Sequence, residues 1–296
     1  MSRYYREMLE NLKMNAPQIT KGLYPKWTIL MKKIKVAMYF WVREEEINDW
    51  FNNKNVFFIL SIGRSGTKFL SSLLNKAPNA LVVHEPFIES IPHQDVFNDP
   101  RKAEEYIQKF RKKEIYLRVR NYDIETYGEV NSFLRRHCQA LKHDLPKATL
   151  IHLVRDGRAV VRSMYSRNTM LPNDYNTKRI RPREDDPWKD EWHKMSRFEK
   201  LCWYWAVENK YLRECIGKTV QFEKLVTDYD YFKKNLLKPL KLDIPEEMWK
   251  SEVNKPKNVT TTYKLPHWKE WDQKKKEAFE RICGDEMKKC GYKLDW

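Results

Sequence analysis

The sequence has few glycines and no long apolar run, and both shortages exclude classes of protein. Only 8 of its 296 residues are glycine, which argues against a collagen-like or linker-rich chain. The longest apolar run, VAMYFWV at residues 36–42, is far shorter than the roughly 20 residues of a membrane-spanning helix. Residues 1–18 contain no apolar stretch of the kind found in signal peptides. We therefore expect a soluble, cytoplasmic protein with no integral membrane segment.

Cysteines are also few, and none of them forms a C-x-x-C pair. An odd number of widely spaced cysteines is typical of reduced, buried thiols in a cytosol-like compartment. The histidines and cysteines show no paired spacing of the kind that holds a metal, such as H-x-x-x-H. We therefore expect no metal and free thiols at all five positions, which are Cys138, Cys202, Cys215, Cys283 and Cys290.

Negative charge is in short supply as well. Lys and Arg number 57 against 41 Asp and Glu, which gives a formal net charge of +16. Such an excess favours anionic partners, whether nucleic acid, an anionic membrane surface or a polyanionic small molecule. Lysines scattered over a solvated surface would give the same number. Apolar residues make up 41% of the chain and aromatic residues 14%, enough for a sizeable core and against intrinsic disorder.

Strands alternate with helices along the middle of the chain. Residues 56–62 form a continuous apolar run, typical of a buried parallel strand, and helical spacing follows over residues 69–74. Shorter apolar runs at 80–83 and 149–154 predict two more strands, and residues 131–141 predict a crossover helix. This alternation predicts an α/β fold, with a central parallel sheet and helices on both faces.

Both ends of the chain favour helices. Residues 1–50 read as polar and helical, so we expect a helical N-terminal extension followed by one domain over residues 51–296. The remaining predicted elements are helices at 159–165, 198–215, 229–240 and 273–289 and a strand at 219–222.

A strand-turn-helix motif begins with the first predicted strand. Its turn places backbone N–H groups at a helix N-terminus, where the helix dipole favours anions. Glycines allow an anion to approach the backbone, and the hydroxyl and cationic side chains add donors. An ordinary glycine turn would explain the glycines but not these donors. We interpret the turn as a phosphate-binding loop, made of Gly63, Arg64, Ser65, Gly66, Thr67 and Lys68. Its spacing matches neither the Walker A pattern nor G-x-G-x-x-G, which disfavours a kinase or ATPase.

A second candidate anion site follows a later strand. Arg155 comes directly after the predicted strand 149–154, and Ser163 lies eight residues further on, two turns into the next helix. Both side chains can therefore reach toward one anion. A nucleotide that carries phosphates at two positions needs two such sites.

The two segments FFILSIGRSGTKFLSSLL and LIHLVRDGRAVVRSMYSR resemble the cofactor-binding segments of the sulfotransferase family. The resemblance continues in YGEVNSFLRRHCQAL, CWYWAVENKYLRE, VQFEKLV and MKKCGYKLDW, and so covers most of the chain from about residue 56. It implies the P-loop-like sulfotransferase fold, with 3′-phosphoadenosine 5′-phosphosulfate (PAPS) as donor, adenosine 3′,5′-bisphosphate (PAP) as product and no metal. The loop would then hold the 5′-phosphosulfate, while Arg155 and Ser163 would hold the 3′-phosphate.

The same resemblance points to a general base. Carbohydrate and tyrosyl-protein sulfotransferases are similar in using a Glu downstream of the loop, and Glu85 lies 21 residues after Arg64 in APNALVVHEPF. We expect Glu85 to take the acceptor's proton and Arg64 to stabilise charge on the leaving 5′-phosphate. His84 is the competing base and a candidate substrate-contacting residue. Because it is adjacent on a strand, it should point to the opposite face. His93 is a poorer candidate.

A late segment, NKPKNVTTTYKLPHW, resembles the C-terminal loop that covers the nucleotide in tyrosyl-protein sulfotransferases. This resemblance implies that Lys264 is a further cation near the phosphosulfate and makes Ser251 a weaker candidate. A surface lysine would be an equally simple interpretation of Lys264.

No motif names the acceptor, which we expect to be a small metabolite or glycan with a hydroxyl or amine, and not nucleic acid. The loop at 166–190 is long, polar and Pro-rich, so it could close over the acceptor. Its basic residues could bind an acidic acceptor or be solvated; they are Lys178, Arg179, Arg181 and Arg183. Two alternatives stay open: a basic nucleic-acid-binding protein, suggested by charge and abundant Trp and Tyr, and a nucleotide kinase with a non-Walker loop.

Overall fold

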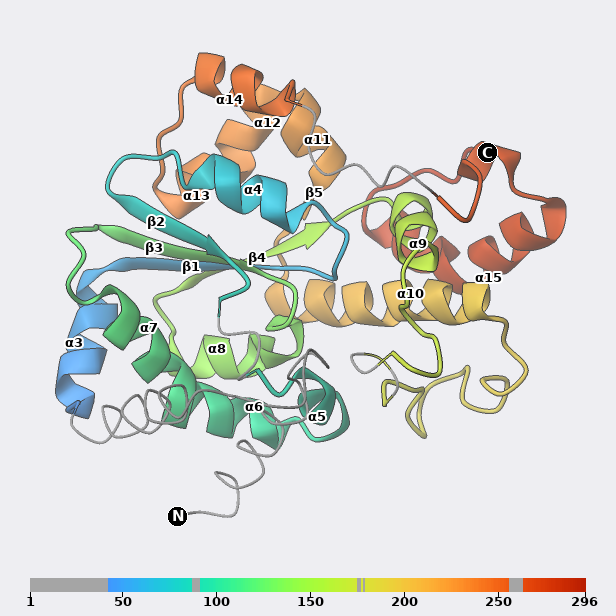
Figure 1. Ribbon diagram of the computed structural model, residues 1–296, viewed down its shortest axis with the longest axis horizontal. Helices are drawn as coiled ribbons and strands as arrows, with labels where there is room; N and C mark the ends of the chain where they lie inside the picture. The colour runs from blue at the N-terminus through green and yellow to red at the C-terminus, as the bar shows by residue number, and fades with distance from the viewer. Residues whose placement is uncertain (1–41, 87–90, 175–176, 178, 256–262) are drawn as a thin grey trace, which may run out of the picture.

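Five parallel strands form the centre of the molecule (Figure 1). The computed structural model describes residues 42–86, 91–174, 177, 179–255 and 263–296. The strands lie in the order β2-β3-β1-β4-β5, and every neighbouring pair is parallel. Their bounds are β1 Asn55–Leu60, β2 Ala80–His84, β3 Thr126–Asn131, β4 Thr149–Val154 and β5 Thr219–Gln221.

Helices cover both faces of this sheet (Figure 1). Successive side chains of a strand point to opposite faces, so β1 contributes to two cores: Phe58 packs in one and Phe57 in the other. The Phe58 face carries α3 Glu44–Asn53, α6 Arg101–Tyr106, α7 Lys112–Val119, α8 Cys138–Asp144 and α10 Arg197–Ile216. The Phe57 face carries α4 Thr67–Leu74, α11 Phe222–Thr227, α12 Tyr229–Phe232, α13 Lys238–Leu240 and α14 Glu246–Val253. The predicted fold class is confirmed.

A third core joins the long α10 to the C-terminal part of the chain, beyond the β4–β5 edge of the sheet. Trp205 and Phe279 are fully buried in it. The helices packed there with α10 are α9 Gly157–Tyr165 and α15 Gln273–Lys289. The other short elements are α5 His93–Asn98, π-helical turns at Ile107–Arg111 and Lys233–Leu237, and 3-10 turns at Arg135–His137 and Trp268–Glu270.

Strand β3, which lies between β2 and β1, is absent from the sequence-based prediction because its composition does not suggest a strand. Gly128 and Glu129 lie at its middle, and both residue types are uncommon in strands. A Cβ at Gly128 would lie only 2.0 Å from the Phe57 ring, so neighbouring packing requires glycine. Glu129 is fully buried and forms an ion pair with Arg111. Tertiary contacts therefore override local preference at both positions.

The predicted helical extension over residues 1–50 lies mostly outside the described residues. The described part is α3, which begins with Glu44, Glu45 and Glu46 at the helix end where negative charge is favourable. Its Ile47 and Phe51 are buried in the core. The expected boundary at residue 50 therefore falls inside a helix that packs on the sheet domain.

The prediction of five free thiols is wrong at two positions. Cys138 of α8 and Cys215 of α10 form a disulfide, with their Cα atoms 6.5 Å apart. These residues are 77 positions apart in sequence, and only the packing of α8 against α10 brings them together. Cys202, Cys283 and Cys290 are free and buried.

No helix within the described residues combines the length and the apolar character that crossing a membrane requires.

Candidate active site

The predicted phosphate loop connects β1 to α4. Gly66 precedes α4 with a φ of 85°, a left-handed conformation that suits glycine. A Cβ at this position would lie 2.1 Å from the Phe222 ring, so both the backbone and the packing require Gly66. At Gly63, by contrast, a Cβ would meet no atom within 4 Å. The loop backbone therefore packs against the Phe222 ring at Gly66, whereas at Gly63 there is free space beside it.

The hydroxyl and cationic groups of the loop have different surroundings. Ser65 is fully buried, and its Oγ has no hydrogen-bond partner among the described residues. Thr67 is also buried, with its Oγ1 2.9 Å from His84 Nε2. The side chains of Arg64 and Lys68 are exposed. The loop thus offers one unused hydroxyl and two accessible cations.

The two predicted phosphate motifs contact each other directly. Arg64 Nε donates a hydrogen bond to Ser163 Oγ at 2.9 Å, and Arg155 Nη1 donates to the Arg64 carbonyl oxygen at 3.1 Å. Residues 91 and 99 positions apart in sequence therefore share one site at the carboxyl ends of β1 and β4. In open α/β sheets, ligands bind at this edge.

Positive charge accumulates at this contact. Arg64 is exposed as a whole, but its Nε end is partly buried against Ser163. This partial burial lowers the pKa of Arg64 most, and the nearby charges of Arg167 and Arg155 lower it further, against an opposing effect of Tyr263. Arg155 and Arg167 therefore both lie close enough to repel Arg64, an arrangement that a bound anion would relieve.

Arg167 was not selected from the sequence. It follows the C-terminus of α9 by two residues, in the long loop at 166–190. The available signal was its spacing: Arg167 is four residues after Ser163, about one helical turn further along the same side. The turn after α9 continues far enough to bring its charge near Arg64.

The candidate base Glu85 follows the last residue of β2. Its φ of 44° is left-handed, which is unusual for a non-glycine residue. The Oε1 atom accepts hydrogen bonds from the Ser132 backbone N–H, at 3.3 Å, and from the Ser132 hydroxyl. The Glu85 side chain is 13% exposed. Ser132, at the end of β3, was not selected from the sequence because that strand was itself missed.

The expectation that His84 and Glu85 point in opposite directions is wrong. His84 Nε2 lies 3.9 Å from Glu85 Oε1 and 2.9 Å from Thr67 Oγ1. The alternation of side chains ends because Glu85 has left the strand with positive φ. Burial lowers the pKa of His84, and the Lys68 charge acts in the same direction, against the opposing effect of Glu85. His84 therefore lies between the loop and the candidate base.

The other predicted residues are less closely tied to the site. His93 begins α5, and its ring contacts Phe133 edge-on at 5.1 Å. The Lys264 backbone N–H donates to Ser166 Oγ at 2.9 Å, while its side chain is exposed. Ser251 is exposed on α14. Neighbouring residues 256–262 of the late segment lie outside the described residues.

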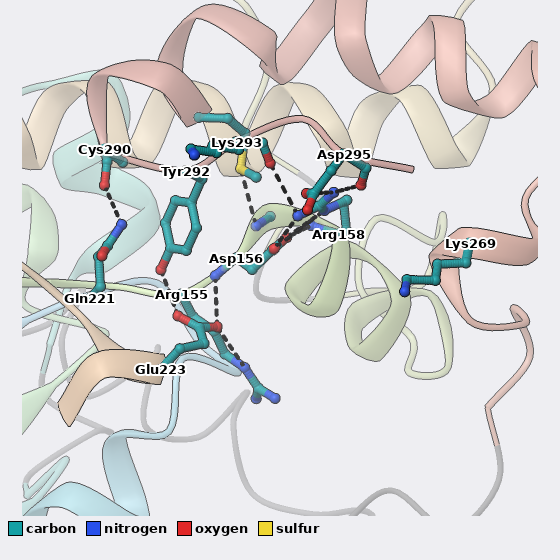
Figure 2. A network of polar contacts seen from close by, with 12 residues as sticks. Arg155, Asp156, Arg158, Gln221, Glu223, Lys269, Cys290, Tyr292, Lys293 and Asp295 are labelled. Carbon is teal, nitrogen blue, oxygen red and sulfur yellow. Dashed lines mark hydrogen bonds and ion pairs between the residues drawn. The ribbon is translucent and has the colours of Figure 1, made fainter. Parts of the chain in front are cut away.

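The C-terminal segment holds the start of α9 in place (Figure 2). Arg158 forms an ion pair with Asp156 at 2.7 Å and with Asp295 at 3.3 Å. Tyr292 donates to Glu223 Oε2 at 2.7 Å, and the backbone N–H of Asp156 donates to Glu223 Oε1 at 3.1 Å. These contacts fix the positions of Asp156 and Glu223, the neighbours of Arg155.

Glu223 also limits the freedom of Arg155. Its Oε1 lies 3.9 Å from Arg155 Nε (Figure 2). The Arg155 guanidinium lies over the Phe222 ring at 5.3 Å. The Phe222 ring in turn meets Phe69 of α4 edge-on at 6.1 Å. The Arg155 side chain is thus one-third exposed. Contacts with the Phe222 ring and the Glu223 carboxylate set the direction in which it points.

Among the residues that the structure describes, no three His, Cys, Asp or Glu side chains are grouped so as to hold a metal ion.

The structure is similar to solved bacterial sulfotransferases. One from Mycobacterium avium is 14% identical, with 99% of this chain and 93% of that chain covered and a TM-score of 0.53. A sulfotransferase from Alicyclobacillus acidocaldarius is 15% identical, with 81% of this chain and 96% of that chain covered and a TM-score of 0.45. At these identities the likeness to the first protein shows a shared fold. None of the curated proteins has a sequence that matches this one.

A family model described as "Sulfotransferase family" matches residues 93–246, which are 154 of the 296 residues. The match contains Arg155, Ser163 and Ser132, whereas the phosphate loop and Glu85 precede it. Because more than half of its sequence fits this model, the chain belongs to the sulfotransferase family.

Proposed function

We propose that the protein is an enzyme that transfers a sulfuryl group from PAPS to a hydroxyl or amine of a small metabolite or carbohydrate, with Glu85 as general base. The observation that carries the proposal is the direct contact between the two phosphate motifs, through Arg64, Ser163 and Arg155. PAPS bears anionic groups at its 5′ and 3′ positions. Two adjoining cationic sites match that distribution of charge.

The residues present fit this donor. Ser65 Oγ is a buried hydroxyl without a partner among the described residues, and an acceptor oxygen of a phosphosulfate would satisfy it. Gly63 leaves open space where a side chain would otherwise stand. The start of α4 adds backbone N–H groups and a favourable dipole. Arg64, Arg155 and Arg167 supply positive charge, and within the described part of the chain the carboxylate paired with Arg155 is that of Glu223, at 3.9 Å.

When bound, PAPS supplies an electrophilic sulfur: the acceptor oxygen or nitrogen bonds to sulfur, and the bond from sulfur to the 5′-phosphate oxygen breaks. The acceptor must lose one proton, which we assign to Glu85 Oε2. The 5′-phosphate gains negative charge, which Arg64 would stabilise. Arg155, Ser163 and Arg167 would bind the 3′-phosphate through charge-assisted hydrogen bonds.

The acceptor would lie beside Glu85, and we expect the loop at 166–190 to close over it. Two of the basic residues of this loop are engaged with α5: Arg179 forms an ion pair with Asp95 at 3.2 Å, and Arg183 bonds to the Phe97 carbonyl oxygen. Arg181 is exposed, and Lys178 lies outside the described residues. We infer that Arg179 and Arg183 fix the loop and do not bind an acidic acceptor.

Calorimetric titration with PAP, beside adenosine 5′-phosphate, tests the donor assignment. We expect PAP to bind at least about tenfold more tightly, because the 3′-phosphate adds charge-assisted contacts. We also expect the same affinity with magnesium and with a chelator. Equal affinities for the two nucleotides would contradict the 3′-phosphate site, and a magnesium requirement would favour a kinase.

Transfer itself is tested by mass spectrometry after incubation with PAPS and four probes: a phenol, an amino sugar, a primary alcohol and a tyrosine-containing peptide. Sulfonation of one of the first three would support the proposed acceptor class. Sulfonation of the peptide alone would contradict it while leaving the donor assignment intact.

A further inference from the structure

Glu85 combines an unusual backbone conformation with specific hydrogen bonds to one of its carboxylate oxygens. Glu85 is held with a φ of 44°, a conformation that persists only where neighbouring contacts compensate its cost. Both donors of Ser132 are directed at the same carboxylate oxygen, Oε1. Within the described part of the chain no residue bonds to Oε2. The two carboxylate oxygens of Glu85 therefore have different environments.

Ser132 is itself held by a buried arginine. Arg135 Nη1 donates to the Ser132 carbonyl oxygen at 2.6 Å. Arg135 is 4% exposed and forms an ion pair with Glu208 of α10, which is fully buried, at 3.0 Å. A second ion pair, from Arg136 to Glu208 at 2.8 Å, fixes that carboxylate. A chain of contacts thus runs from α10 through Arg135 and Ser132 to Glu85.

A second buried arginine holds the residue that follows Glu85. Arg111 Nη1 donates to the Pro86 carbonyl oxygen at 3.3 Å. Arg111 is fully buried and pairs with Glu129 and Glu114. Buried ion pairs contribute little net stability, because desolvation offsets their attraction. Two such networks on either side of Glu85 therefore point to positioning as their role.

We propose that Ser132, held by Arg135, is a positioning residue that binds Oε1 of Glu85 and leaves Oε2 free for the acceptor's proton. This inference rests on the proposed function of Glu85 as base. Proton transfer goes from the acceptor to Oε2, while the Ser132 hydroxyl keeps its own proton and its bond to Oε1. Two donors on one oxygen stabilise the ionised carboxylate and fix its orientation.

Other charges face the same carboxylate. His84 Nε2 lies 3.9 Å from Oε1 on the β2 side, and Arg135 interacts electrostatically with Glu85 from the turn after β3. Lys68 of α4 acts on His84. None of these groups donates a hydrogen bond to Glu85 within the described residues, so the effect of Ser132 can be separated from theirs by substitution.

The test compares Ser132→Ala, Ser132→Thr and Ser196→Ala. Ser196 is a matched control, because its backbone N–H and hydroxyl both donate to Glu199 Oε2, each at 2.8 Å, at the start of α10. Carbon NMR of protein labelled at the glutamate carboxyls, with the Glu85 signal assigned by Glu85→Gln, reports at one fixed pH the chemical shift of this carboxyl, which responds to the hydrogen bonds it accepts. Transfer from PAPS to the best of the four probes gives kcat and KM.

For Ser132→Ala we expect the carboxyl signal of Glu85 to move to a different chemical shift, because the carboxylate loses its hydroxyl donor. We expect kcat to fall about tenfold and KM for PAPS to change less than about twofold. Ser132→Thr should restore both the chemical shift and kcat. Ser196→Ala should leave the Glu85 chemical shift and kcat unchanged.

An unchanged chemical shift of the Glu85 carboxyl in Ser132→Ala would overturn the inference, and this readout needs no acceptor. A fall in PAP affinity as large as the fall in kcat would do the same, because it would indicate general disruption of the site. If Glu85→Gln keeps full transfer activity, the proposed base is wrong, whatever the Ser132 variants show.

Discussion

Two residues assigned to the chemistry, Arg64 and Glu85, stand in left-handed backbone with φ of 71° and 44°. Each such conformation costs about 1–3 kcal/mol in a non-glycine residue. Both side chains are held by specific contacts, Arg64 by Ser163 and Glu85 by Ser132. The strain and the contacts together direct the guanidinium and the carboxylate to fixed places, which rapid transfer requires.

Glu85→Gln should abolish most transfer and leave nucleotide binding intact. The amide cannot accept the acceptor's proton, so we expect kcat to fall about a hundredfold or more. The PAP dissociation constant should stay within about twofold, because Glu85 contacts no cation of the loop. Rate assays and calorimetry measure the two effects. Glu247→Gln, at an exposed position of α14, is the control and should change neither.

Arg167→Ala should weaken PAP binding by about tenfold or more, through loss of a charge-assisted contact to the 3′-phosphate. Adenosine 5′-phosphate, which lacks that group, should bind nearly as before. The control is Arg181→Ala, which removes an exposed arginine from the same loop. If Arg181→Ala weakens PAP binding equally, the effect is general surface charge and not a site.

At the scale of elements, α9 carries one side of the proposed nucleotide site, and the C-terminal segment holds the start of this helix. Asp156 caps α9 by accepting from the Arg158 N–H at 2.8 Å, and Arg158 reaches Asp295. Tyr292 and the Asp156 N–H each donate to one carboxylate oxygen of Glu223 and hold it beside Arg155 (Figure 2). The position of Arg155 thus depends on residues more than a hundred positions later in the chain.

Tyr292→Phe should lower the affinity for PAP by about threefold. Without the Tyr292 hydroxyl, Glu223 can turn toward Arg155, from which it lies 3.9 Å, and compete with the 3′-phosphate. The affinity for adenosine 5′-phosphate should not change, so the ratio of the two dissociation constants is the measurement. Tyr122→Phe, at a position 58% exposed, is the control. An unchanged ratio would show that Glu223 does not depend on Tyr292.

At the scale of the whole molecule, the Cys138–Cys215 disulfide connects α8 to α10. Titration of the denatured, unreduced protein should find three reactive thiols, and five after reduction, because Cys202, Cys283 and Cys290 are free. Reduction should lower the free energy of unfolding by about 2–4 kcal/mol. Five thiols before reduction would contradict the disulfide, and Cys202→Ala is the control that removes one thiol without opening the bridge.

Stability should also depend on pH through two buried histidines. Burial lowers the pKa of His152 to about 4 and that of His137 to about 3. Below the unfolded value of 6.5 the unfolded chain binds protons that the folded protein does not, so the free energy of unfolding should fall as pH decreases from 6.5 toward 4. Above 6.5 this effect is absent, because both states are neutral.

His137→Leu should lower the slope of the free energy of unfolding against pH by an amount equivalent to about one proton taken up on unfolding. Urea unfolding between pH 6.5 and about 5 measures this slope. His137 is fully buried, and neither ring nitrogen has a hydrogen-bond partner among the described residues. The leucine variant should therefore also be more stable at low pH. The exposed His143 gives the control, His143→Leu, which should keep the full slope.

The sequence alone predicts the parts of this protein whose signals are local. Continuous apolar runs predict β1 and β4, and the donors that follow each run predict the loop and the Arg155–Ser163 pair. It does not predict β3, because Gly128 and Glu129 are acceptable there only beside the Phe57 ring and the Arg111 guanidinium. Ser132 and Arg167 were missed for a related reason: their roles depend on neighbours that are distant in sequence.

What the tertiary structure decides is which distant residues meet. The contact of Arg64 with Ser163, the bond of Ser132 to Glu85 and the Cys138–Cys215 bridge each join segments separated by 47 residues or more. The parallel sheet creates the first two, since it brings the carboxyl ends of strands that are far apart in sequence to one edge. Local sequence patterns reflect the preference of each segment for helix, strand or turn. The contacts between distant residues, by contrast, arise only when the strands pair and the helices pack.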